Sequence, residues 1–188
     1  MSLRLHVLGA SGSGTSTLGQ AIAENLCIQF YDTDDFYWAT SDVPYTVKHD
    51  VGDRLAKMRT AFDERPSWVL SGSLCGWGDQ LIPLFTHVVF LHVPWEVRWQ
   101  RLVERERSRY GDDAIKPGGK MHKVYTDFMD WASRYDTAGV EQRSYATHEQ
   151  WLNRLPRACS ILRVEDEALA TSSTARLASE VISQLDIL

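Results

Sequence analysis

Short apolar runs and helical apolar patterns alternate along the chain. Leu3–Leu8 is an apolar-rich run that ends at Gly9, and from Thr17 onward apolar residues recur at helical spacing. A second short apolar run, Ile28–Tyr31, follows this predicted helix. The order strand, glycine loop, helix, strand is typical of a parallel α/β sheet with right-handed crossovers.

The same alternation continues to the C-terminus. Three further strands are predicted, at Trp68–Leu70, Thr86–Val93 and Ser160–Val164. Further helices are predicted at Val51–Phe62, from Trp95 onward, at Met121–Tyr135, at Glu141–Leu155 and after a cap at Thr171 or Ser172. Glu165–Ala170 is expected to be a loop. In the last helix we expect Leu177, Val181 and Leu185 to pack into the core.

Composition limits the classes of protein to consider. The 188 residues suffice for one well-cored domain, and no apolar run approaches the length of a membrane span. A net charge of -5 argues against a general nucleic-acid or membrane-surface binder. We therefore expect a cytoplasmic protein without nucleic-acid or membrane partners. Cys27, Cys75 and Cys159 lack the spacing of a zinc site or disulfide framework, and we expect them in the core.

One segment is locally basic. Between Arg98 and Lys123 there are eight Lys or Arg residues and four Asp or Glu residues. Four arginines share one face of the helix predicted from Trp95: Arg98, Arg101, Arg105 and Arg109. Like charges on one stripe repel, so an anionic ligand is one explanation, and a solvated basic face is the alternative.

The loop after the first strand is rich in glycine. Gly9, Gly14 and Ser16 match a phosphate-binding P-loop, G-x-x-x-x-G-K-S/T, except that Thr15 stands at the lysine position. In such a loop, backbone N–H groups and the positive end of the helix dipole converge on phosphate, and the hydroxyl at Ser16 ligates magnesium. Because threonine brings no charge, catalysis would need a cation from elsewhere. The alternative is a flexible strand-to-helix turn.

Carboxylates follow the second strand. Asp32, Asp34 and Asp35 lie where open α/β sheets bind ligands, and they could hold magnesium or accept a proton, with Asp34 favoured over Asp32. Alternatively, Thr33 or Asp34 caps a short helix. The next residues, 36–38, are aromatic and either cover a substrate ring or pack against a lid. A second glycine turn, Ser71-Gly72-Ser73, follows the third strand.

Taken together, these motifs resemble the adenylate kinase and shikimate kinase branch of the P-loop kinases. The resemblance implies a three-layer α/β P-loop NTPase fold with a five-stranded parallel sheet in the order 2-3-1-4-5, helices on both faces and a helical lid. It implies a single kinase domain over residues 1–188, with an acceptor-binding region at about 32–80 and a lid at about 105–140. It also implies ATP and Mg2+ as cofactors.

The resemblance assigns roles to residues. The nucleotide-binding residues are Gly9, Ser11, Gly12, Ser13, Gly14, Thr15, Ser16, Thr17 and Arg101. The acceptor-binding residues are Asp32, Asp34, Arg59, Ser71, Gly72 and Ser73. Ser16 and Asp34 would hold the metal, and the catalytic residues would be Asp34, Arg105, Arg134 and Arg143. We hypothesise that the three arginines compensate for the missing lysine.

The sequence therefore predicts transfer of a phosphoryl group from ATP to a small acceptor, either a nucleoside monophosphate or a hydroxylated metabolite. Two other functions stay open: a nucleotide-binding protein whose catalysis Thr15 has impaired, and a regulatory P-loop NTPase. The sequence identifies neither the acceptor nor the oligomeric state.

Overall fold

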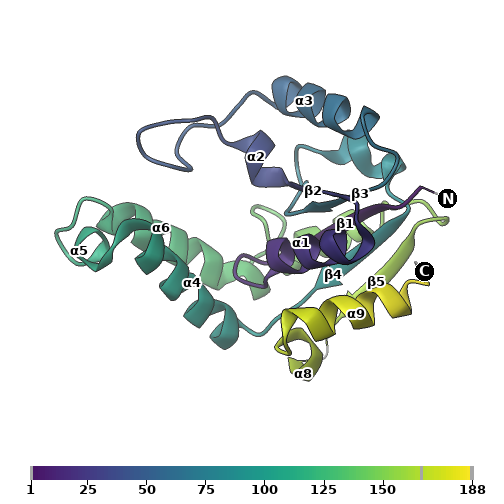
Figure 1. The fold of residues 1–188 in the computed structure, drawn as a ribbon. Helices are drawn as coiled ribbons and strands as arrows, with labels where there is room; N and C mark the ends of the chain where they lie inside the picture. Colours follow the sequence, from purple (N-terminus) through teal and green to yellow (C-terminus); the bar gives the residue numbers. More distant parts are fainter. Residues whose placement is uncertain (1, 166, 187–188) are drawn as a thin grey trace.

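A parallel sheet forms the centre of the molecule (Figure 1). The computed structural model describes residues 2–165 and 167–186. Its strands are β1 (Arg4–Gly9), β2 (Gln29–Asp32), β3 (Trp68–Ser71), β4 (His87–Leu91) and β5 (Ser160–Val164). Their order is β2-β3-β1-β4-β5 and every pairing is parallel. The predicted fold class and strand order are confirmed.

Helices cover both faces of this sheet. On one face lie α1 (Thr15–Leu26) and α9 (Thr174–Gln184); on the other lie α3 (Val51–Asp63), the 3-10 helix η1 (Asp79–Leu84) and α7 (Tyr145–Leu152). Successive residues of a strand point to opposite faces of the sheet. Leu5 and Val7 therefore pack with α1 and α9, while Leu8 packs with α3. Leu177, Val181 and Leu185 of α9 and the turn after it are buried, as predicted.

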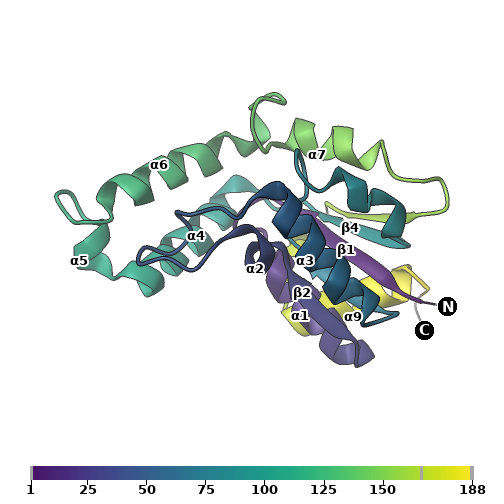
Figure 2. The ribbon, with the colours of Figure 1, turned by 90° about the horizontal axis from the view of Figure 1, so that it is seen from above.

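A helical arm projects from one end of the sheet (Figures 1 and 2). It contains α4 (Trp95–Tyr110), α5 (Asp112–Ile115) and α6 (His122–Ser133), and a 3-10 turn, η2 (Arg134–Asp136), leads back toward the sheet. Leu102 of α4 packs against Met129 and Ala132 of α6, so the two long helices share a small core of their own. The short helix α2 (Thr33–Tyr37) directly follows β2. No helix within the described ranges has both the length and the apolar character of a membrane span.

Several predicted boundaries were wrong for local reasons. The helix predicted at Glu141–Leu155 is restricted to α7, because the Ser144 hydroxyl accepts from the Thr147 N–H and caps it there. The helix predicted at Met121–Tyr135 ends at Ser133 and tightens into η2. Ser173, not Thr171 or Ser172, caps α9.

Two other expectations also change. The predicted loop Glu165–Ala170 contains a short helix, α8 (Glu167–Ala170), and Asp166 lies outside the described residues. Of the three cysteines expected in the core, Cys159 is buried, Cys75 is half-buried and Cys27 is exposed.

Two histidines are enclosed in the fold. His6 stacks on Phe85, with ring centroids 4.9 Å apart, and its Nδ1 is 3.1 Å from the Leu70 carbonyl oxygen. His148 on α7 is also fully buried. Burial lowers the pKa of His6 to about 4; for His148, burial and then the nearby charge of Arg143 lower the pKa to about 3. Both rings are therefore neutral in the folded protein at neutral pH.

We predict that the free energy of unfolding falls as pH drops below about 6.5, where both histidines bind protons in the unfolded chain but not in the fold. Each should cost about 2 kcal/mol between pH 6.5 and 5, because one proton changes stability by about 1.4 kcal/mol per pH unit. Urea unfolding at a series of pH values measures this. His148→Gln should remove about half of the slope, and a stability that stays constant down to pH 5 would contradict the prediction.

Candidate active site

A cavity of about 830 Å³ is lined by the glycine-rich loop between β1 and α1, α2, the turn after β3, α4 and α6. Because β1, β2 and β3 are parallel neighbours, their carboxyl ends meet at one edge of the sheet, which is where open α/β sheets bind ligands. Arg143, just before α7, also lines the cavity. The arm formed by α4 and α6 thus supplies one wall and the sheet edge supplies another.

The glycine-rich loop adopts a tight turn directly before α1. Gly14 has φ +96°, and a Cβ on Gly9 would lie 2.4 Å from the Leu91 carbonyl oxygen, so both positions need glycine. The Ser13 hydroxyl is buried and donates to the Ala10 carbonyl oxygen at 2.8 Å. The other predicted loop residues line the cavity: Gly9, Ser11, Gly12, Gly14, Thr15, Ser16 and Thr17. The loop therefore presents a helix N-terminus and glycine backbone to the cavity, as a phosphate site requires.

Asp32 joins this loop to the neighbouring strands. Its Oδ2 accepts from the Ser16 hydroxyl at 2.5 Å and from the Ser71 hydroxyl at 2.8 Å. Its Oδ1 accepts from the Asp34 backbone N–H at 3.0 Å, so Asp32, rather than Thr33 or Asp34, caps α2. Ser71 is buried, and its hydrogen bond fixes the position of the Asp32 carboxylate.

The oxygen atoms at Ser16 and Asp32 fit a magnesium ion. Mg2+ prefers hard oxygen ligands and usually takes only one or two from carboxylates, the rest being phosphate oxygens and water. Within the described residues, no group of three or more His, Cys, Asp or Glu side chains could hold a metal without such help. The structure brings Asp32, rather than the predicted Asp34, to the Ser16 hydroxyl.

Asp34 and Arg143 are two charged residues that both line the cavity. Arg143 Nη2 donates to the Ser11 hydroxyl at 2.6 Å, and its guanidinium carbon lies 4.7 Å from the centre of the Trp131 ring. Burial lowers the pKa of Arg143 while Asp34 opposes that shift. For Asp34, burial and then the charge of Asp32 raise the pKa, against the opposing charge of Arg143. Arg143 therefore contacts the glycine-rich loop and lines the same cavity as the carboxylate that has a raised pKa.

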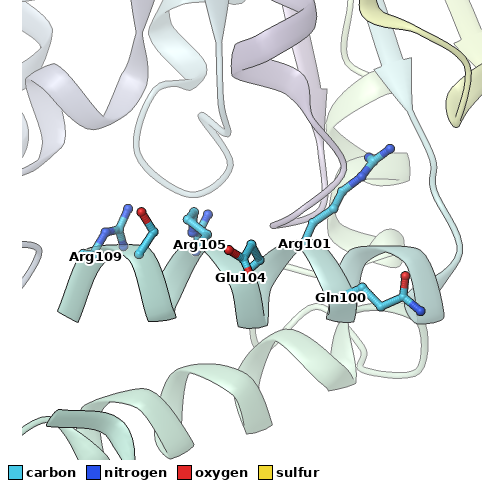
Figure 3. A pocket seen from close by; sticks show the side chains of 6 residues that line it. Gln100, Arg101, Glu104, Arg105 and Arg109 are labelled. Atoms are coloured by element: carbon cyan, nitrogen blue, oxygen red, sulfur yellow. The ribbon is translucent and has the colours of Figure 1, made fainter. Parts of the chain in front are cut away.

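Three arginines of α4 also reach the cavity: Arg101, Arg105 and Arg109. Figure 3 shows these side chains on the side of α4 that faces the loops. Arg101 Nη1 donates to the Ser13 carbonyl oxygen at 3.0 Å, whereas Arg105 and Arg109 pair with Glu106 at 2.9 and 3.2 Å. Glu106 thus neutralises part of the basic stripe.

Arg98, the fourth member of the predicted stripe, has a different role. It is fully buried, donates from Nε to the Val93 carbonyl oxygen at 2.8 Å and forms an ion pair with Asp136. This contact ties α4 to the turn after α6, so Arg98 supports the arm and does not belong to a ligand-facing stripe.

Four predicted site residues do not line the cavity: Ser13 and Ser71, which are buried, and Arg59 and Arg134. Arg134, the first residue of η2, is exposed and pairs at 3.1 Å with Asp130 in the last turn of α6. Arg59 is exposed on α3 and donates to Gln80 at 2.8 Å. Gly72 and Ser73, in contrast, line the cavity beside Asp34.

Several residues that line the cavity were not predicted as site residues, among them Lys48, Trp77 and Trp131. Lys48 arrives through an isolated antiparallel bridge to Trp38, and its ammonium lies 5.6 Å from the Tyr37 ring centre. Phe128 and Trp131, three residues apart, share one face of α6, so helical spacing was a usable signal for Trp131. Lys48 had no such signal, because its position follows from the bridge.

Solved structures of small-molecule kinases share this fold. Shikimate kinase from Acinetobacter baumannii, in complex with shikimate, aligns with 100% of this chain and 94% of its own at a TM-score of 0.55 and 14% identity. A sugar kinase from Janibacter sp. HTCC2649 aligns with 100% of this chain and 96% of its own at a TM-score of 0.54 and 15% identity. Identities this low establish the P-loop kinase fold alone.

Sequence comparison gives a nearer relative. No protein-family model matches the chain. The curated protein described as "Uncharacterized protein YqaC", from Bacillus subtilis (strain 168), is 42% identical over 167 residues, which cover 89% of this chain and 90% of that protein. Identity at this level over nearly the whole of both chains places this protein in the same family as YqaC.

Proposed function

We propose that this protein is an ATP-dependent, Mg2+-dependent kinase that phosphorylates a hydroxyl group of a small acceptor. The observation that carries the proposal is that Arg143 contacts Ser11 of the glycine-rich loop and shares one cavity with Asp34. A donor-phosphate cradle, a guanidinium and a carboxylate with a raised pKa are thereby placed around the same space. Phosphoryl transfer consists mostly of such positioning and charge neutralisation.

On the donor side, the glycine-rich loop would hold the ATP phosphates through its backbone N–H groups and the start of α1. Ser16 and Asp32 would hold Mg2+, which when bound neutralises phosphate charge. Arg101, anchored on the Ser13 carbonyl, would lie against the nucleotide. Closure of the segment at about 105–140 as a lid over the donor would exclude water.

On the acceptor side, we propose that Asp34 accepts the proton of the attacking hydroxyl. A base works best when its pKa approaches the working pH, and burial together with Asp32 moves the Asp34 pKa in that direction. Gly72 and Ser73 line the same part of the cavity and would contact the acceptor. On this proposal, the acceptor would bind within the region at about 32–80.

Arg143 is our candidate for the charge that Thr15 lacks. Its guanidinium donates to Ser11 of the loop, and no carboxylate of the described residues lies within ion-pair distance of it. Arg105 and Arg109, in contrast, both pair with Glu106. Arg134 is directed to Asp130 on the surface. We therefore assign the compensating role to Arg143, with Arg105 in a secondary position.

Thr15 also favours a second candidate function, a nucleotide-binding protein without catalysis. The two are separated by measuring ADP release from MgATP with a pooled set of nucleoside monophosphates, shikimate and other alcohols, alongside direct binding of ATP. Acceptor-dependent ADP release supports the kinase. Tight ATP binding without any release supports the second candidate, and the absence of ATP binding would contradict both.

Arg143→Ala should lower acceptor-dependent turnover about a thousandfold, because one arginine on a transferring phosphoryl group commonly contributes at least that much. Arg134→Ala is the matched control: the same change on the surface partner of Asp130 should leave turnover within about twofold of wild type. Steady-state ADP release measures both. Equal losses in the two variants would refute the assignment of Arg143.

Asp34→Asn should abolish transfer yet raise thermal stability at pH 8. Because the folded pKa of Asp34 is raised, ionising this carboxyl destabilises the fold, and the penalty grows as pH rises through that pKa. The neutral amide avoids the penalty, so the gain in Tm over wild type should shrink toward zero near pH 4. Calorimetry at pH 4, 6 and 8 measures the trend, and a loss of stability that deepens with pH would contradict it.

A further inference from the structure

Aromatic side chains line the cavity beyond the glycine-rich loop. Tyr37 of α2, Trp77 of the turn after β3 and Trp131 of α6 all line it. They come from three separate parts of the chain, so no single helical core pattern accounts for them. A cavity in which aromatic walls stand beside polar and charged groups is typical of a site for a ring-bearing ligand that also carries polar groups.

These rings are held in place from outside the cavity. The guanidinium carbon of the buried Arg54 lies 3.8 Å from the centre of the Tyr37 ring, and Arg54 Nε donates to the His49 carbonyl oxygen. Trp77 meets Tyr37 edge-on at 5.6 Å, and its Nε1 donates to the Ser73 carbonyl oxygen at 3.1 Å. The aromatic walls are therefore ordered before a ligand binds, which reduces the entropic cost of stacking.

A chain of buried hydrogen bonds fixes one polar group beside these aromatic residues, the Ser73 hydroxyl. Tyr135 Oη lies 2.7 Å from His148 Nδ1. The nearby guanidinium groups of Arg98 and Arg143 cannot accept a hydrogen bond, which favours the Tyr135 hydroxyl as the donor to His148. His148 Nε2 then carries the ring proton and donates to the Ser73 hydroxyl oxygen at 3.1 Å. The Ser73 hydroxyl then keeps its own proton to donate toward the cavity. Its neighbour there is the Cys75 thiol, which is a weak acceptor.

We infer that the acceptor carries a planar aromatic or heteroaromatic ring, which packs against Tyr37, Trp77 and Trp131 and accepts a hydrogen bond from Ser73. This inference rests on the proposed kinase function. In the transfer, the acceptor oxygen forms the new P–O bond, its proton passes to Asp34, and the bond between the γ-phosphorus and the β,γ-bridging oxygen breaks to release ADP.

A ring-free polyol fits this cavity less well. Each of its hydroxyl groups needs a hydrogen-bond partner once water is removed, and a buried hydroxyl without one destabilises the complex. Aromatic faces offer such groups little, whereas they stack favourably on a planar ring, as they do on nucleic-acid bases. The balance therefore favours ring-bearing acceptors.

The test compares two sets of acceptors singly. Adenosine, cytidine 5′-monophosphate and pyridoxine carry aromatic rings, and shikimate, gluconate and glucose do not. For each, acceptor-dependent ADP release is measured with MgATP, and binding to the protein with ADP present is measured by calorimetry. We expect release or binding with at least one ring-bearing compound and with none of the ring-free compounds.

Variants locate the ring site. Trp77→Ala and Trp131→Ala should each raise KM for the active ring-bearing acceptor about tenfold to a hundredfold, and Trp77→Ala should leave KM for ATP unchanged. Trp131→Phe should retain most of the affinity because it keeps an aromatic face. Trp99→Ala is the matched control, since Trp99 is 41% exposed on α4 and does not line the cavity.

The outcomes separate the inference from the proposed function. Transfer to shikimate, gluconate or glucose, without transfer to any ring-bearing compound, would retain the kinase and overturn the aromatic acceptor. Binding of a ring-bearing compound without ADP release would support the ring site and count against the kinase. No binding and no release with every ring-bearing compound would overturn the inference. A fall in kcat alone in both tryptophan variants would also overturn it.

Discussion

Parallel pairing of β2, β3 and β1 is the constraint on which the site depends. Because neighbouring strands run in the same direction, their last residues meet at one edge, and Ser16, Asp32 and Ser71 come within hydrogen-bonding distance although they are far apart in the sequence. The same pairing turns the glycine-rich loop toward α2. A carboxylate, a hydroxyl and a helix N-terminus are thereby fixed by the sheet before any ligand arrives.

Charge is distributed unevenly around this edge of the sheet. The distribution matters because Thr15 stands where a P-loop has lysine. Glu106 pairs with Arg105 and Arg109, and Asp136 pairs with Arg98, so much of the basic content of α4 supports the arm. Arg143 instead lies on Trp131 and donates to Ser11. Guanidinium is more weakly hydrated than ammonium and stacks on aromatic faces, which suits it to a half-buried position of this kind.

The fold could be predicted from the sequence, whereas the site could be predicted only in part. Buried parallel strands give continuous apolar runs, so each strand could be predicted from its residues, whereas the sheet order was implied by the resemblance to the P-loop kinases. Arg134 and Arg143 were indistinguishable by spacing, because the turn η2 and the Ser144 cap, which set their directions, depend on tertiary contacts. Asp32 was ranked below Asp34 as a metal ligand, since its role as the cap of α2 and partner of Ser16 requires the folded loop.

The central claim is that Arg143 supplies the charge that the loop lost with its lysine, and a rescue experiment tests it most directly. Thr15→Lys restores the loop lysine and can be combined with Arg143→Ala. The account predicts that the double variant turns over at least about tenfold faster than Arg143→Ala alone, because either cation can neutralise the same phosphate charge. A double variant that binds ATP but turns over no faster than Arg143→Ala would contradict the claim.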